Sequence, residues 1–211
     1  MRTEHLSSNL FVGPKCASAI PAAHPLVRDA VIQASFDPTV SRIEFLPSVR
    51  VGRHTVVLNA VVVTKDTRRC LLDVVDARPL RTIDDEGLLL LAIEQAGIET
   101  IQISESAIRR EPRCSNAREI WRSRFRSLSS RDRLNILDAL DEHGPLSIAQ
   151  LVSELGDSDC WEKVLSLACE GEVQIDIDAA IDSETVVRRR YQIESTSPSF
   201  DLEPRKSEAL R

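Results

Sequence analysis

The sequence lacks the features that mark several classes of protein. Its longest apolar run, residues 87–93, is far shorter than the roughly 20 residues that cross a bilayer. The five cysteines are an odd number, and no two lie closer than nine positions, which fits neither a disulfide framework nor a zinc knuckle. The first residues carry no basic segment followed by an apolar stretch, so we expect no secretion signal. These absences predict a cytoplasmic protein with free thiols and no membrane contact.

An excess of positive charge is also missing. Lysine and arginine number 27 against 33 aspartates and glutamates, which gives a formal charge of −6. General nucleic-acid-binding proteins are basic, so any contact with DNA must come from a local patch. Hydrophobic residues make up 42%, as in ordinary globular proteins, and 211 residues suffice for one large domain or two small ones.

The first part of the chain alternates between helical and strand patterns. Residues 1–22 show no periodicity, and we predict a flexible arm there. From Pro25, apolar residues recur at helical spacing. This helix should end at 36–38, because a residue before proline is pushed out of the helical region. Strands are then predicted over 41–46 and 48–51, interrupted by Pro47, and over 54–64 and 70–77, joined by a hairpin turn at 65–68.

The two later strands are apolar on both faces, which predicts a sheet covered by helices on each side. Thr82 is expected to cap a helix that runs to Ala96 and stops at Gly97, with acids in its first turn. A short strand over 100–103 and a polar helical stretch over 105–126 follow. The order α-β-β-β-α-β predicts an α/β or α+β domain over residues 23–126.

A second periodic pattern follows a small polar linker that starts at residue 127. We predict three helices, over 131–143, 147–155 and 160–170, and two strands, over 172–178 and 185–193. Three helices followed by a two-stranded ribbon form the winged-helix pattern. We therefore predict a small winged-helix domain over 127–194 and a disordered tail over 195–211.

Three segments of the first domain follow one another in an order shared with a family of nucleases. The first segment runs from residues 26–29 through Phe36-Asp37-Pro38 and includes residues 44–47. The second is 70–77. The third is 107–113, together with Asn116-Ala117-Arg118 and Trp121-Arg122. On these segments, residues 24–126 resemble the TnsA family, the endonuclease subunits of heteromeric transposases, which belong to the PD-(D/E)XK nucleases. The resemblance implies a restriction-endonuclease-like mixed sheet flanked by helices. A winged helix after the nuclease domain also matches that family's architecture.

The same resemblance implies a site for Mg²⁺. Such nucleases hold the metal with acidic oxygens, and the metal and a lysine activate water and stabilise charge on the phosphate. By resemblance, the family's helix glutamate falls on Val27, its strand aspartate on Val57 or Asn59, its ExK acid on Asp73 and its lysine on Val75. One carboxylate of three remains, which favours a non-catalytic protein without a cofactor. Mg²⁺ is expected only if the site is active.

A second acid, Asp76, follows Asp73 by an odd number of positions. If both lie on one strand, their side chains point to opposite faces and cannot share a metal.

Arginines are concentrated after the predicted sheet. Residues 105–133 contain nine arginines and four acids, and arginine forks fit phosphate oxygens bidentately. Residues 134–187 instead contain thirteen acids and one base, Lys163, which a DNA groove would repel. We therefore predict that the winged helix binds protein and that DNA contacts come from the arginine-rich segment. The candidate contacts are Arg109, Arg110, Arg113, Arg118 and Arg122, of which Arg118 and Arg122 are the favoured pair.

Three functions remain open at this point. The first is a catalytically degenerate TnsA-like subunit of a transposition or mobile-element complex, partnered by a DDE-type transposase subunit or its ATPase regulator. The second is an active Mg²⁺-dependent endonuclease with a relocated site. The third is a transcriptional regulator that acts through the winged helix.

Overall fold

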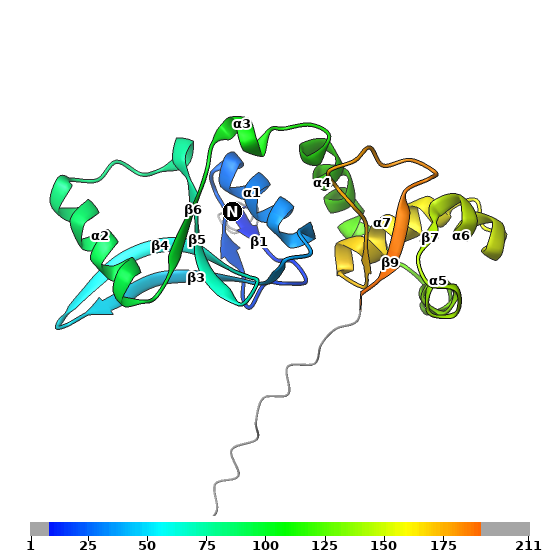
Figure 1. Ribbon diagram of the computed structural model, residues 1–211, viewed down its shortest axis with the longest axis horizontal. Coiled ribbons are helices and arrows are strands. Elements are labelled where there is room, and N and C mark those ends of the chain that lie inside the picture. Colours follow the sequence, from blue (N-terminus) through cyan, green and yellow to red (C-terminus); the bar gives the residue numbers. More distant parts are fainter. Residues whose placement is uncertain (1–8, 191–211) are drawn as a thin grey trace, which may run out of the picture.

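The computed structural model describes residues 9–190, which form a mixed α/β structure (Figure 1). Its central sheet has the strand order β3-β4-β5-β6, with the first three strands antiparallel and β6 parallel to β5. The predicted mixed sheet flanked by helices is confirmed. The four strands are β3 (Val40–Val51), β4 (His54–Lys65), β5 (Arg68–Val74) and β6 (Glu99–Ile103).

Helices cover both faces of this sheet, as the apolar strands predicted. Val61 and Val63 belong to a core cluster with α1 (Pro25–Phe36), whereas Val62 packs with α2 (Ile83–Gln95). Successive side chains of a strand point to opposite faces, so β4 is buried on both sides where it crosses the middle of the sheet. Full burial of one valine side chain contributes roughly 1.5–3 kcal/mol.

Local signals determine where the two helices begin and end. Pro25 occupies the first turn of α1, the His24 side chain accepts a hydrogen bond from the Leu26 amide, and Asp37 ends the helix before Pro38. At α2, the Thr82 hydroxyl accepts a hydrogen bond from the Asp85 amide at 3.1 Å. The predictions for both helices are confirmed.

Two of the predicted strands have different limits. β3 is a single strand that passes through Pro47, where its pairing with β4 shifts by one residue. Proline is tolerated there because β3 is an edge strand and the bulge removes the need for an N–H donor. β5 ends at Val74, and 75–77 form a short 3₁₀ helix, η2 (Val75–Ala77), so the predicted strand 70–77 is too long.

The stretch predicted as one helix over 105–126 is divided. It contains α3 (Glu105–Ile108), α4 (Arg113–Arg122) and the 3₁₀ helix η3 (Ser123–Phe125). Pro112 separates α3 from α4, because proline has no N–H to continue a helix.

The N-terminal segment is part of the fold over the residues that the structure describes. β1 (Leu10–Phe11) and β2 (Ile20–Pro21) form a small hairpin, and Phe11 and Ile20 are completely buried. The Phe11 ring stacks on Trp121, with centroids 4.4 Å apart. The predicted flexible arm is therefore wrong for residues 9–22, and residues 1–8 lie outside the described part. The apolar residues of this segment follow no regular period, and the partner of Phe11 is distant in the sequence.

The last part of the described chain contains three helices and a small three-stranded sheet of order β7-β9-β8. The three predicted helices are confirmed, and the strands are shorter than predicted. The assignment of this unit as a winged helix stays a prediction, and the expected tail, 195–211, lies outside the described residues. The elements are α5 (Ser130–His143), β7 (Leu146–Ser147), α6 (Ile148–Leu155), α7 (Cys160–Glu170), β8 (Val173–Gln174) and β9 (Val186–Arg189).

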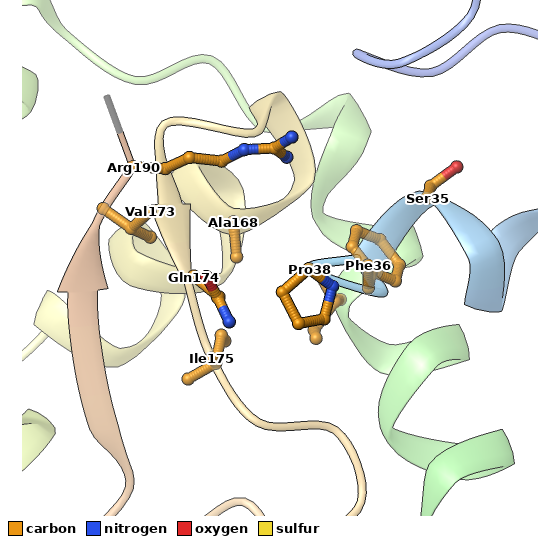
Figure 2. Close-up of a pocket in the computed structure, with 9 residues that line it drawn as sticks. Ser35, Phe36, Pro38, Ala168, Val173, Gln174, Ile175 and Arg190 are labelled. Carbon is orange, nitrogen blue, oxygen red and sulfur yellow. The ribbon is translucent and has the colours of Figure 1, made fainter. Parts of the chain in front are cut away.

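One hydrophobic core joins this unit to the sheet. A single buried cluster extends from Phe11 and α1 through α4 to α7. At the joint, the Asn116 side chain donates to the carbonyl oxygens of Ile177 (3.0 Å) and Ala179 (2.6 Å). Figure 2 shows a pocket here between the end of α1 and α7, with a volume of about 20 Å³, room for about one water. The joint is therefore closely packed at this point.

Candidate functional site

A cleft of about 450 Å³ lies where β4 and β5 diverge. The two strands are paired from Val62 and Leu71 to the hairpin turn, but not on the other side of these residues. Val27, Asn59 and Asp73, three positions of the nuclease-family pattern, all line this cleft. The fold therefore places around one cleft residues that are far apart in the sequence.

Only one of the two alternative strand positions, Asn59, lines the cleft. Asn59 lines the cleft, whereas Val57 is 66% exposed and borders a separate hollow beside Arg81 and Leu88. Asn59 has a φ of 47°, in the left-handed region that asparagine adopts more readily than most residues. It lies where β4 has one residue more than β3 between paired positions.

Asp73, the retained acid, is held by Arg78. The Arg78 Nε donates to Asp73 Oδ1 at 2.9 Å, and Nη2 donates to Oδ2, so the guanidinium forms a two-pronged pair with the carboxylate. This hydrogen bonding raises the pKa of Arg78. A metal ion at Asp73 would have to displace a bound cation.

Two further residues near Asp73, Val75 and Asp76, do not line the cleft. Val75, at the lysine position, lies in η2 beyond the end of β5 and does not line the cleft. Asp76 also lies in η2, so its expected place on the opposite face of the strand is wrong. Its Oδ2 instead accepts a hydrogen bond from the Glu105 amide at 2.6 Å, at the start of α3, where the helix dipole favours an acid.

Val27 and Asp73 approach the cleft from opposite faces of the sheet. Val27, Leu72 and Val74 pack in one cluster on the α1 side. Because side chains alternate along a strand, Asp73 lies on the α2 side, beside its register partner Gln102. The two positions therefore share the cleft without converging on one point.

One further carboxylate lines the cleft. Glu86, on α2, pairs with Arg81 at 3.7 Å. Within residues 9–190, no group of three or more histidine, cysteine, aspartate or glutamate side chains is arranged to hold a metal ion. Sequence reasoning missed Arg78, Glu86 and Gln102. The only signal for Arg78 was its place five positions after Asp73 and directly before Pro79, and the η2 turn decides that it folds back.

Four of the five candidate DNA-binding arginines pair with carboxylates inside the molecule. Arg122 is exposed on α4 and has no ion-pair partner among residues 9–190. The other four therefore present less free charge than the sequence indicated. The pairs are Arg109 with Glu105 (2.6 Å), Arg110 and Arg113 with Asp178 (3.3 and 2.6 Å), and Arg118 with Asp29 (2.6 Å).

The favoured pair, Arg118 and Arg122, divides into two different roles. Arg118 binds both oxygens of Asp29 and so ties α4 to α1. This bond raises the pKa of Arg118. Near Arg122, the Arg124 guanidinium lies 3.8 Å from the centre of the Phe125 ring and 4.8 Å from that of Trp121. Phe125 itself is mostly exposed, so an aromatic ring and cationic side chains share this surface.

The C-terminal unit is acidic, and its one base between 134 and 187 is neutralised. Lys163, on α7, pairs with Asp132 at 2.8 Å and Asp157 at 2.5 Å. Both hydrogen bonds raise the pKa of Lys163. The surface of this unit therefore has no free lysine to contact phosphate on the helix that usually reads DNA in winged-helix proteins.

Lys15 is an ionisable residue that the sequence did not single out. It is almost fully buried, and its Nζ donates to the backbone oxygen of Asp37. Burial, with a contribution from nearby Arg190, lowers the pKa of Lys15 to about 7.

Comparison of the sequence with protein-family models and with curated proteins finds no match. The resemblance to the TnsA family therefore rests on the segments quoted above. In the part of the chain that the structure describes, no helix is long and apolar enough to span a membrane.

Proposed function

We propose that the chain is a cytoplasmic, non-catalytic relative of the TnsA endonuclease subunits that serves as a binding subunit of a transposition or mobile-element complex. The observation that supports this most is the pairing of Asp73 with Arg78 in a cleft whose other family positions are Val27 and Asn59. The Arg78 guanidinium is bound to Asp73, the only acid of the motif that the chain retains.

The chemistry of phosphodiester cleavage explains why this arrangement favours loss of activity. Mg²⁺ is held by several oxygen ligands, usually carboxylates, and it must activate water and neutralise charge on the phosphate. The cleft offers one acid of the motif, already paired, and an amide at Asn59. No lysine lines the cleft to stabilise the developing charge.

The proposed DNA contact is the exposed surface around Arg122. Arg122 is unpaired within residues 9–190, and Arg124 with the exposed Phe125 lies next to it in the chain. Such a surface suits a phosphate backbone and a stacking partner. In this proposal Arg118 supports the surface by holding α4 on α1.

The proposed protein contact is the acidic C-terminal unit, which we interpret as a winged helix. Residues 134–187 contain thirteen acids, and the one lysine among them is internally paired. A basic protein surface fits this charge, and a DNA groove does not. By resemblance, the partner is a DDE-type transposase subunit or its ATPase regulator.

Cleavage of supercoiled plasmid tests the central claim. The purified chain and the Asp73→Ala variant are each incubated with plasmid and about 10 mM Mg²⁺ or Mn²⁺, a concentration of the order that saturates weak carboxylate sites. Nicked DNA is then quantified. We expect no nicking above the level of the Asp73→Ala protein. Metal-dependent nicking that disappears in Asp73→Ala would overturn the proposal.

An active endonuclease with a relocated site is the second candidate, and Glu86 favours it. Glu86 lines the same cleft as Asp73, so two carboxylates are within one hollow. Both are paired with arginines, which would have to move when metal and DNA bind. Nicking that is lost in both Asp73→Ala and Glu86→Ala would identify this alternative.

A further inference from the structure

Between residues 87 and 93, helix α2 has no polar side chain, and only one side of it is covered. Leu89, Ala92 and Ile93 are buried against the sheet. Away from the sheet, Ile83 is 91% exposed and Leu91 is 53% exposed, and Leu90, 60% exposed, borders the cleft that contains Asp73. A helix that is hydrophobic all round is normally buried, so the fold leaves part of α2 without its expected cover.

The exposed residues of the helix form one surface, which we call the α2 surface: Ile83, Gly87, Leu90 and Leu91. Ile83, Gly87, Leu90 and Leu91 recur at helical spacing and so lie along one stripe. Leu80 precedes the helix and is fully exposed. Helix α2 lies at one end of the molecule, far from α5, α6 and α7 (Figure 1).

Gly87 lies in the middle of this stripe without a reason inside the molecule. A Cβ added at Gly87 would meet nothing within 4 Å. Glycine in a helix interior destabilises the fold by about 0.5–1 kcal/mol relative to alanine. A glycine on an exposed apolar stripe does allow the backbone of another helix to approach closely. Gly87 therefore leaves room for the backbone of a partner at the middle of the stripe.

Charge decides between the possible occupants. Helix α2 carries four acids and no base. Glu86 pairs with Arg81, and Asp85 accepts a hydrogen bond from Thr82. Asp84 and Glu94 have no ion-pair partner among residues 9–190, and they flank the two ends of the stripe. Two copies of α2 facing each other would bring like charges together, so a symmetric contact between two α2 helices does not fit.

We propose that the α2 surface binds an amphipathic helix of another protein, with apolar residues on one face and lysine or arginine beside them. The apolar face would pack on Leu90 and Leu91, its backbone would approach Gly87, and its basic residues would meet Asp84 and Glu94. The contact would be one helix packed side by side on another. It uses neither the arginine-rich segment nor the acidic C-terminal unit.

Two synthetic helical peptides test the proposal with the full chain. Both carry leucine at helical spacing on one face, and the other face is lysine in one peptide and glutamate in the other. Binding is followed by fluorescence anisotropy. We expect the lysine peptide to bind and the glutamate peptide to bind at least about tenfold more weakly. Equal binding of the two peptides, or no binding of the lysine peptide, would overturn the proposal.

Three variants test whether the lysine peptide binds at the α2 surface. We expect Leu91→Gln to weaken the lysine peptide about tenfold, as loss of a central apolar contact does. Gly87→Ala should weaken it too, while raising the stability of the chain, which a variant that merely damages the fold cannot do. Leu134→Gln removes an equally exposed leucine from α5 and should leave binding unchanged. Equal weakening by Leu134→Gln would contradict the site.

Sedimentation velocity and vesicle binding test whether a second copy of the chain or lipid binds the α2 surface instead. Self-association of the chain that Leu91→Gln abolishes would assign the α2 surface to a second copy. Binding to phosphatidylcholine vesicles that the same change abolishes would assign it to lipid. Either result would replace the proposed partner.

Discussion

Arg78 and Asp73 form a two-pronged ion pair across a turn of five residues, with Nε and Nη2 of the arginine on the two oxygens of the aspartate. The pair depends on η2, which ends β5 and returns the chain toward the cleft. A strand continued to Ala77 would have carried Arg78 away from Asp73. The same turn places Val75 in η2, outside the lining of the cleft.

A double-mutant cycle measures this ion pair. Arg78→Gln, Asp73→Asn and the double variant are unfolded with urea, and we expect a coupling free energy of about 0.5–1 kcal/mol. The value is near the upper end for pairs open to solvent, because the geometry is bidentate and the Asp73 side chain is 15% exposed. Additive effects of the two single changes would show that the pair does not form in solution.

Arg118 and Arg122 should differ in their effect on DNA binding. We expect Arg122→Ala to weaken binding to a labelled duplex without changing the stability of the chain. The slope of log affinity against log salt concentration should become shallower by about one, as for the loss of one phosphate contact. Arg118→Ala should instead destabilise the fold by roughly 1 kcal/mol, because it breaks the tie to Asp29.

Two further variants control this comparison. Asp29→Asn should reproduce the loss of stability of Arg118→Ala, since it removes the other half of the pair. Arg53→Ala, in the exposed turn between β3 and β4, removes the same charge far from α4 and should change DNA binding little. If Arg53→Ala weakens DNA binding as much as Arg122→Ala, only the overall charge matters.

Buried Lys15 predicts a rise in stability between about pH 7 and 8.5. Its pKa is about 7 in the folded chain and near 10.4 when exposed, so in this window the unfolded chain holds the proton and the folded chain has lost it. The free energy of unfolding then increases with pH, by roughly 1 kcal/mol over the window.

Urea unfolding at pH 7.0, 7.75 and 8.5 checks this prediction; the range is set by the folded-state pKa of about 7. Lys15→Met should give a flat dependence over the same range. Burial raises the pKa of the Cys160 and Cys169 thiols to about 11. These two thiols lower the stability only above about pH 9, where the exposed thiols of the unfolded chain lose their protons. A rise that persists in Lys15→Met would assign it to another group.

Phe11 tests the place of the N-terminal segment in the core. Its ring is completely buried and stacked on Trp121. We expect Phe11→Ala to lower the free energy of unfolding by about 3–5 kcal/mol, the usual loss for a buried aromatic side chain. Val12→Ala, at a mostly exposed neighbour, should cost little. Equal, small losses for both variants would mean that the hairpin is not part of the core.

Much of the secondary structure could be predicted, because the signals are local. Pro25, Thr82 and Gly97 lie at the ends of their helices, and the hairpin turn at 65–68 was expected from its polar residues. The N-terminal hairpin could not be predicted, since Phe11 finds its partner 110 positions away at Trp121. The choice of Asn59 over Val57 was equally inaccessible, because it depends on where β4 and β5 separate.

By itself, the sequence determined the order of helices and strands and the opposite charges of the arginine-rich and C-terminal segments. These follow from periodicity and composition, which are properties of neighbouring residues. Only the tertiary structure decided which charges remain free. Arg118 meets Asp29 across 89 positions and Arg113 meets Asp178 across 65, and ion pairs at such separations depend on packing. The covered and uncovered sides of α2 were decided in the same way, by which side the sheet reaches.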